Sequence, residues 1–126
     1  MADTEAVRVQ NCGILLADKE AFVREILDRV GDRWSLLVLG HLREKPHRYS
    51  GLVKVVPGIS QRMLTVTLKQ LTDDGLLRRQ AYAELPPRVE YSLTPLGESF
   101  LDTASAFVRW TVLHHDEIQA NRQRDV

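Results

Sequence analysis

Residues 57–79 read PGISQRMLTVTLKQLTDDGLLRR, and they predict a helix whose beginning and end are both marked in the sequence. Ser60 is a favourable N-cap residue, and Ile59 before it has the spacing from Leu64 of a hydrophobic staple. At the other end, Gly75 supplies the left-handed residue that commonly follows a helix. We therefore expect a helix over residues 60–74.

The two faces of this helix differ in chemistry. With about 100° of rotation per residue, Leu64, Leu68 and Leu71 share one face, which predicts packing on a core. The opposite face is polar and basic. A DNA major groove admits one helix, which must present hydrogen-bond donors while a core holds its back. The candidate DNA-contacting residues of the helix are Ser60, Gln61, Arg62, Thr65 and Lys69.

These residues suit different DNA groups. Arg62 has the chemistry to bond guanine O6 and N7, and Gln61 has the chemistry to pair with adenine. Ser60 and Thr65 suit phosphates or base edges, while Lys69 lies further along the helix, nearer the DNA backbone. The plainer interpretation is that basic side chains on an exposed helix face are only solvated.

Upstream of this helix the sequence predicts three more helices. Asp18 to Val30 has an apolar stripe on one side and is typical of an amphipathic helix. Residues 34–42 are apolar on nearly every side, which predicts a central, buried helix. Pro46 ends that helix, and a short helix over residues 50–55 then leads to a turn at Pro57 and Gly58.

Downstream, residues 77–82 and 88–93 alternate in the manner of two strands and predict a hairpin, the wing, over about 77–93. Its basic residues are Arg78, Arg79 and Arg88, which could reach a minor groove or phosphates, or could instead pair with Glu84 or Glu90. Thr94 and Pro95 then form an N-cap and first-turn proline, so a last helix is expected over about 95–120. Its apolar set is broad enough to suggest contact with a second chain.

This order of elements is that of a winged helix-turn-helix. The predicted fold class is α+β and mostly helical, a single domain over residues 1–126, with N- and C-terminal dimerisation helices around the DNA-binding part. The helix over 60–74 is its expected recognition helix.

Charge is distributed unevenly along a chain that is neutral as a whole. Residues 33–90 hold ten Lys and Arg against five Asp and Glu, a net charge of +5, which leaves −5 for the rest. The middle of the chain can therefore attract a polyanion. No apolar run approaches the ~20 residues of a membrane span, and the N-terminus lacks the layout of a signal peptide. We expect no membrane association and a cytoplasmic location, where a single cysteine stays reduced.

Catalysis and metal binding find little support in the sequence. We identify no catalytic triad, Gly-rich phosphate loop or HExxH motif, and therefore predict no enzymatic activity and no cofactor. His114, His115 and Asp116 are adjacent, but neighbouring residues point to different sides of a helix, so we expect no metal site. The remaining alternative is a winged helix used for protein–protein contact without DNA binding.

Several segments carry a resemblance to a known family. They are Cys12, GDRWSLLVLGHL (31–42), PHRYSGL (46–52), PGISQRMLTVTLKQLTDDGLLRR (57–79) and PPRVEYSLTPLGESF (86–100). In this order they resemble the HxlR-type branch of winged-helix regulators, relatives of the MarR group, from Cys12 to Trp110. The resemblance implies a homodimeric transcriptional regulator, usually a repressor, on an inverted-repeat operator. Its half-sites would be ~34–36 Å apart in double-stranded DNA.

Four positions depart from the family pattern. Asp32 and Arg33 stand where Gly and Lys are common, and Gly51 stands where an acidic residue is usual. Val66 occupies an outer-face position that is often glutamine. We expect only Val66 to affect function, because it exchanges a hydrogen-bonding group for apolar contact, for instance with a thymine methyl.

Cys12 is the candidate redox-sensing residue, since the family often carries a cysteine here and some members sense oxidants or electrophiles with it. Its place before the first helix would lower the pKa of its thiol. The alternative is a buried structural cysteine. The chain has one cysteine, so oxidation would need a bridge between two copies or capping by a small thiol. The competing signal is a small-molecule effector in a pocket between the last helix and the DNA-binding core.

Overall fold

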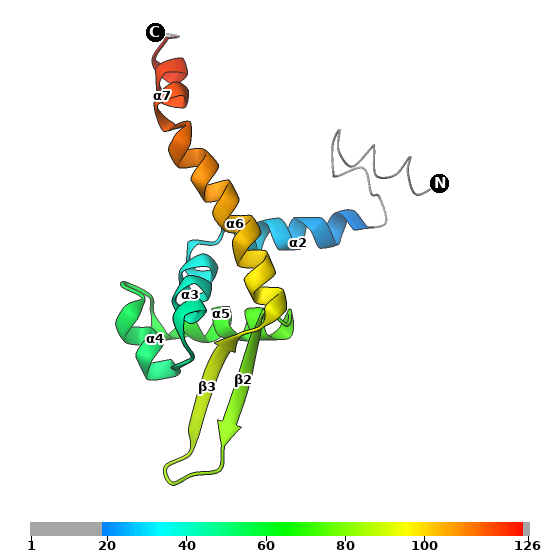
Figure 1. Cartoon of the computed structure of the whole chain (residues 1–126), viewed down its shortest axis with the longest axis vertical. Coiled ribbons are helices and arrows are strands. Elements are labelled where there is room, and N and C mark those ends of the chain that lie inside the picture. The colour runs from blue at the N-terminus through cyan, green and yellow to red at the C-terminus, as the bar shows by residue number, and fades with distance from the viewer. Residues whose placement is uncertain (1–18, 125–126) are drawn as a thin grey trace. The chain divides into compact units, whose positions relative to one another are not determined.

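A computed structural model describes residues 19–124 of the chain (Figure 1). Cys12 lies outside the described residues. Contacts divide the chain into two compact units, residues 1–33 and residues 34–126. The described part of the first unit is mainly α2 (Glu20–Gly31), an amphipathic helix that begins two residues later than predicted. None of its residues is buried, and Phe22 and Leu27 are more than half exposed.

The second unit holds the remaining elements, in the order that the sequence predicts with two differences. Helices α3 (Arg33–Glu44, which begins at the boundary), α4 (Tyr49–Val55) and α5 (Gln61–Asp73) come first. The hairpin of β2 (Leu77–Tyr82) and β3 (Arg88–Leu93) follows, and the chain ends in α6 (Pro95–Leu113) and α7 (His115–Arg124). Figure 1 shows the hairpin extending beyond α5, while α6 runs away from it. The first difference is a short strand, β1 (His47–Arg48), and the second is the break between α6 and α7.

The core of this unit lies between α3, α4, α5 and the beginning of α6. Leu39, Leu52, Leu64 and Leu71 are completely buried in it. The leucine face predicted for α5 is therefore correct, and its opposite face is exposed. Burying each such side chain contributes ~1.5–3 kcal/mol relative to leaving it in water, which fixes the back of α5 firmly.

Both predicted ends of α5 are present. The Ser60 Oγ accepts a hydrogen bond from the Met63 N–H at 3.0 Å, so Ser60 is the N-cap. After the helix, Gly75 has φ +81°, a conformation that a residue with a Cβ rarely adopts. The Leu76 N–H then donates to the Leu71 carbonyl at 2.9 Å, which returns the chain to the core and starts β2.

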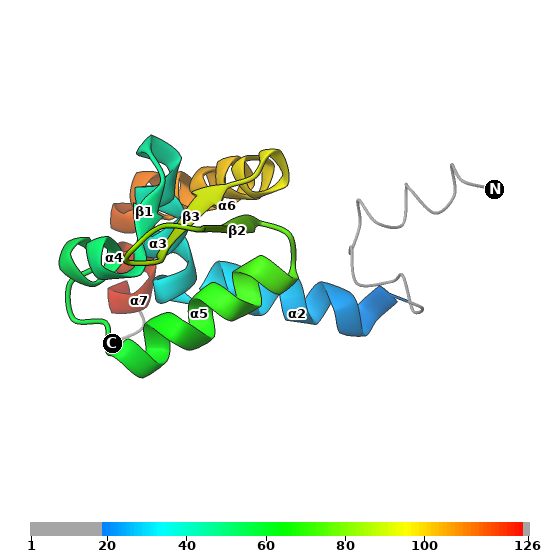
Figure 2. The ribbon, with the colours of Figure 1, turned by 90° about the horizontal axis from the view of Figure 1, so that it is seen from below.

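The sheet is antiparallel with strand order β1-β3-β2. β2 and β3 pair along their full length, from Leu77 opposite Leu93 to Tyr82 opposite Arg88. β1 adds two residues at the other side of β3, with His47 opposite Tyr91. The sequence does not predict β1, because two residues are too short to show an alternating pattern. Figure 2 shows the three strands from below, with α5 next to the sheet.

The last helix is shorter than predicted. Instead of one helix to about residue 120, α6 ends at Leu113 and α7 begins at His115. His114 leaves the helical conformation with φ −106° and ψ 11°. Its imidazole stacks on Trp110 with 4.5 Å between ring centroids, and its Nδ1 lies 2.8 Å from the Trp110 carbonyl oxygen. These contacts hold His114 outside the helix, and Asp116 and Glu117 favour the new helix start that follows.

A single joint connects the hairpin to α6. The Thr94 Oγ1 caps α6 by accepting from the Gly97 N–H at 2.9 Å, as its N-cap position predicts. The same hydroxyl donates towards two carbonyl oxygens, that of Gly75 at 2.6 Å and that of Leu76 at 3.0 Å. Gly97 is buried here, and a Cβ at this residue would lie 2.1 Å from the Leu76 carbonyl oxygen. Only glycine therefore fits this position.

No helix within residues 19–124 is long and apolar enough to span a bilayer.

Candidate nucleic-acid interface

The interface begins with the attachment of α4 to α5. The Tyr49 hydroxyl, from the first residue of α4, donates to the Gln61 carbonyl at 2.9 Å and lies 3.2 Å from the Thr65 Oγ1. A turn with Gly58 at φ +81° separates the two helices. Tyr49 thus positions the first two turns of α5. This role of Tyr49 is not among the sequence predictions, although a tyrosine beside a helix start, with an apolar ring and a polar tip, is a suitable signal.

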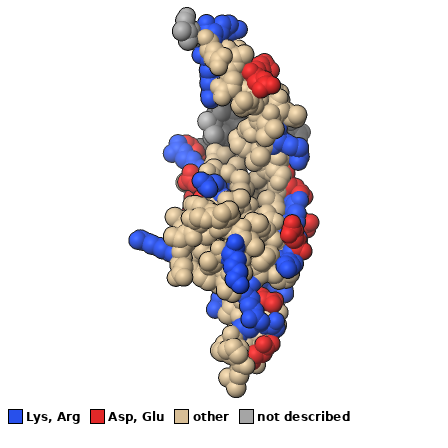
Figure 3. Space-filling model, turned by 90° about the vertical axis from the view of Figure 1, so that its left-hand side faces the viewer, with Lys and Arg blue, Asp and Glu red and all other residues tan. Residues whose placement is uncertain are grey.

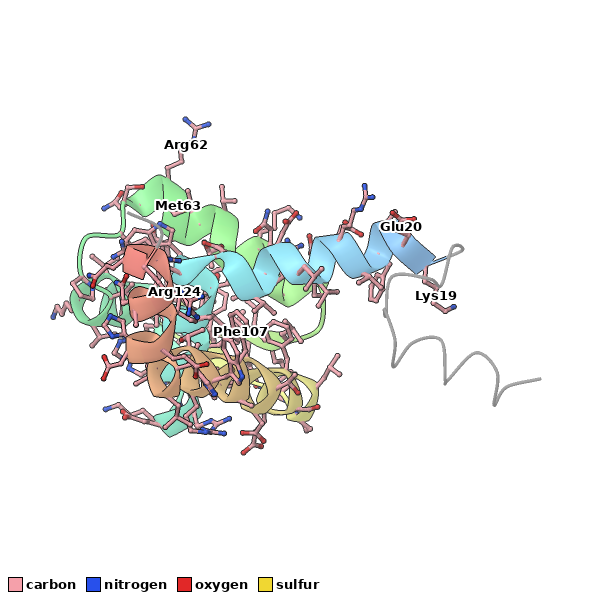
Figure 4. The ribbon with its side chains drawn as sticks, turned by 90° about the horizontal axis from the view of Figure 1, so that it is seen from above. Lys19, Glu20, Arg62, Met63, Phe107 and Arg124 are labelled. Carbon is pink, nitrogen blue, oxygen red and sulfur yellow. The ribbon has the colours of Figure 1, made fainter. Side chains whose placement is uncertain are left out.

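The outward side of α5 presents the residues predicted to read bases. Figure 4 shows Arg62 projecting away from the ribbon, and it makes no ion pair with any described residue. Gln61 is also exposed, and so is Val66, with 42% of its surface accessible. Ser60 is exposed as well, but its hydroxyl already caps the helix. An arginine whose five donors have no intramolecular partner in the described chain can bond a guanine or a phosphate without first breaking another interaction.

Thr65 and Lys69 follow on α5, and both have intramolecular partners. The Thr65 hydroxyl is beside Tyr49, and the Lys69 Nζ forms an ion pair with the Asp73 Oδ2 at 2.9 Å. The side chains of this ion pair are 75% and 63% exposed, so the pair contributes only ~0–1 kcal/mol. A DNA phosphate can therefore compete with Asp73 for the ammonium group.

The three arginines of the hairpin differ from one another. Arg78 donates to the Gln80 side chain at 2.9 Å and remains exposed, and Arg79 is exposed too. Arg88 instead bonds Glu84 at 3.0 Å and Glu90 at 3.3 Å. Its guanidinium also lies over the Tyr82 ring, 4.1 Å from the centroid. The alternative considered for the wing arginines, pairing with Glu84 or Glu90, thus describes Arg88, whose side chain is only 26% exposed.

A groove of about 380 Å³ separates α5 from the hairpin. Three predicted DNA-contacting residues line it together, Thr65, Lys69 and Arg79, with Tyr49 and Tyr91 beside them. Arg62 and Arg88 are not among its lining residues. With α5 in a major groove, as in a helix-turn-helix, and the hairpin at the next minor groove, the DNA backbone between the two grooves would cross this space. The groove therefore has the position and the donors for contact with that backbone.

Basic side chains are spread over the lower part of the face that carries α4 and the hairpin, with acidic ones interspersed, as Figure 3 shows. Among the predicted DNA-contacting cations, those of Arg62, Lys69, Arg78 and Arg79 are exposed, whereas Arg88 is held by two carboxylates. Within residues 19–124, no group of three or more His, Cys, Asp and Glu side chains could hold a metal ion. His115 lies 3.0 Å from Asp116, and His114 bonds back to its own helix.

Comparisons with known proteins show which proteins this chain is similar to. The chain is 46% identical over 99 residues to the HTH-type transcriptional regulator YtfH of Escherichia coli (strain K12). These 99 residues make up 79% of each of the two chains. The solved structure of ytfH from Salmonella typhimurium is 42% identical, with a TM-score of 0.67 over 80% of this chain and 90% of that one. The redox regulator HypR in its oxidised form is 34% identical, with a TM-score of 0.63 over 71% of this chain and 92% of HypR.

The fold, the exposed face of α5 and these similarities define the class of this protein as a transcriptional regulator with a winged helix-turn-helix DNA-binding domain. The model of the HxlR-like helix-turn-helix family matches residues 29–119. The chain belongs to that family, which confirms the resemblance found in its sequence.

Proposed function

We propose that this regulator is a homodimeric repressor that binds an inverted-repeat operator in the cytoplasm and releases it in response to an oxidant, an electrophile or a small ligand. The observation that carries the proposal is the arrangement around α5. Its exposed side presents Gln61 and Arg62, and a groove with Thr65, Lys69 and Arg79 lies between it and the wing. This arrangement suits a helix in the major groove and a DNA backbone beside it.

In this proposal each residue has a defined role. Arg62 and Gln61 read base edges, while Thr65 and Lys69 bond phosphates, as do Arg78 and Arg79 on the wing. The Ser60 hydroxyl caps α5, so Ser60 supports binding mainly by orienting the helix start towards phosphate oxygens. Arg88 keeps the wing in shape through its two carboxylate partners and reaches DNA only if they release it.

The exposed apolar side chains of α6 support a dimer. Leu96, Phe107, Trp110 and Leu113 are 58%, 56%, 51% and 76% exposed. Figure 4 marks the position of Phe107 on this helix. Large apolar groups clustered on one helix favour burial against another chain. A two-fold dimer would present two copies of α5 to successive major grooves, which is why we propose an inverted repeat.

The proposed redox signal rests on Cys12 and on the similarity to HypR, a redox regulator solved in its oxidised form. Diamide would take up two electrons and two protons as the Cys12 thiols of two copies join in a disulfide. The linked arms would then hold the two copies of α5 at a spacing that no longer fits the operator.

The experiment is a footprint of the purified protein on its own upstream intergenic DNA, with and without diamide. Protection of an inverted repeat that diamide abolishes supports the whole proposal, and Cys12→Ser should then remove the diamide effect. If release by diamide persists in Cys12→Ser, the redox role is wrong. Protection that survives diamide leaves a ligand as the signal, whereas binding that is neither specific nor salt-dependent on any genomic sequence contradicts the proposed function itself.

A further inference from the structure

A second groove lies between α3 and α6, away from the hairpin. It has a volume of about 350 Å³, which is within the range of small-molecule sites. Leu101 and Ala104 are its buried residues, and Leu36, Val108 and Val112 add apolar walls. The groove is therefore mostly apolar, and its remaining lining residues are Gly40, Ser105 and Arg109.

Gly40 is one of the small residues that line the groove. It stands in the interior of α3, where glycine stabilises a helix less than alanine does. A Cβ built on Gly40 would have nothing within 4 Å, so no close packing requires glycine here. The missing side chain instead leaves space between the two helices. A helix that gives up stability without a packing reason is a candidate for a role in binding.

The charges along the groove are unequal. Arg43 of α3 bonds Asp102 of α6 at 2.5 Å, which neutralises both groups next to the groove. Arg109 has no ion-pair partner among residues 19–124. An apolar cavity beside one unpaired guanidinium is complementary to a molecule with an apolar body and a single carboxylate, which an arginine can bind with two hydrogen bonds.

This groove also differs from the surface proposed for the dimer. At about 100° per residue, Phe107 and Trp110 lie about 60° apart on α6, and Val108 and Val112 are about 100–140° from Phe107, whereas Arg109 lies about 40° from Leu113 of the proposed dimer surface. A second copy packed on Phe107 and Trp110 therefore does not have to fill the groove.

We propose that the groove between α3 and α6 binds a small amphipathic carboxylate whose ring or branched chain fills the space at Gly40 and whose carboxylate bonds Arg109. The inference deepens the proposed function, because it names the chemistry and the site of the small-ligand signal. Since α3 leads directly into β1 and α4, a molecule between α3 and α6 would change how the DNA-binding helices are held relative to α6.

The test measures binding of 2-naphthoate to the full-length protein by calorimetry, without DNA. The uncharged isostere 2-naphthamide is the matched ligand control. We expect saturable binding of 2-naphthoate, about tenfold weaker binding of 2-naphthamide, and a similar loss for 2-naphthoate on Arg109→Gln. Arg122→Gln makes the same charge change on α7 and should bind like the wild type.

Gly40→Leu places a side chain in the groove and should abolish binding, while Gly40→Ala, with its single methyl group, should bind nearly normally. Thermal melting checks that each variant folds, and Arg109→Gln, at an exposed position, tests the site independently should Gly40→Leu not fold. In DNA titrations, 2-naphthoate should weaken operator binding of the wild type and leave that of Gly40→Leu unchanged.

Three results would overturn the inference. Equal binding of 2-naphthoate to the wild type and Gly40→Leu would place any site elsewhere, and equal binding of the amide would exclude a role for Arg109. A change of oligomeric state in Gly40→Leu, measured by sedimentation equilibrium, would show that a second copy covers the groove. Because binding is measured without DNA, 2-naphthoate binding by a protein that ignores DNA would contradict the proposed function and leave this site standing.

Discussion

Replacing Arg62 with alanine separates base reading from general attraction to DNA. Its side chain is exposed and makes no ion pair with the described residues, so the free energy of unfolding should change by less than ~0.5 kcal/mol. Removing a bidentate hydrogen-bonded pair between an arginine and a base costs ~1–3 kcal/mol, which weakens binding about 5- to 150-fold for each half-site. In a dimer both half-sites are affected, so the free-energy cost doubles.

The assay is fluorescence anisotropy at one fixed salt concentration, on the protected duplex and on a duplex of the same composition in shuffled order. Affinity of the dimer for the specific duplex should fall by the square of the half-site factor, at least about 25-fold, and affinity for the shuffled duplex should fall much less, because that duplex offers only phosphates to Arg62. Arg122→Ala, at an exposed arginine of α7, is the matched control and should change neither. Equal decreases on the two duplexes would refute base reading by Arg62, and a lower melting temperature would assign it a structural role.

Three further substitutions test the rest of the interface and its support. Lys69→Ala should weaken binding to all sequences and reduce the salt slope by about 0.9 for each phosphate that the protein no longer neutralises, and an unchanged slope contradicts a phosphate-binding role for Lys69. Gly97→Ala brings a Cβ to 2.1 Å from a backbone carbonyl oxygen and should cost at least ~3 kcal/mol in thermal unfolding. Gly40→Ala, which meets open space, is its control and should gain ~0.5–1 kcal/mol. Tyr49→Phe should cost ~1 kcal/mol, and a double-mutant cycle with Thr65→Val should show coupling.

The parts of the fold that the sequence predicts are those specified by local chemistry. Ser60 and Thr94 both cap the helices that they precede, and Gly75 adopts the left-handed conformation expected of it. The break at His114 could not be predicted in this way. The apolar pattern continues through Leu113, and the break depends on how one imidazole packs on Trp110 and bonds its carbonyl.

The sequence predicts which residues face outward at the candidate site, but not which of its cations are held by carboxylates in the folded chain. A basic outer face on α5 follows from helix geometry, and Arg62 occupies it as expected. Whether a cation is available depends instead on interactions across strands and turns, which a sequence does not show. Arg88 is held by carboxylates on two sides, while Arg79 lines the groove beside α5. The role of Tyr49 could not be predicted, because it depends on the crossing of α4 and α5.

The joint at Thr94 connects DNA reading to any signal received by α6. Its hydroxyl bonds the carbonyl oxygens of Gly75 and Leu76, which close α5 and lead into β2, while it also caps α6 through Gly97. Gly97 is pressed against the same Leu76 carbonyl, so the joint has no free space in which to absorb a movement. A displacement of α6, whether by a second copy or by a ligand next to α3, must therefore move the end of α5 and the base of the wing together. The two elements that we propose to contact DNA would then respond as one body, which is what a regulator with a single on–off transition requires.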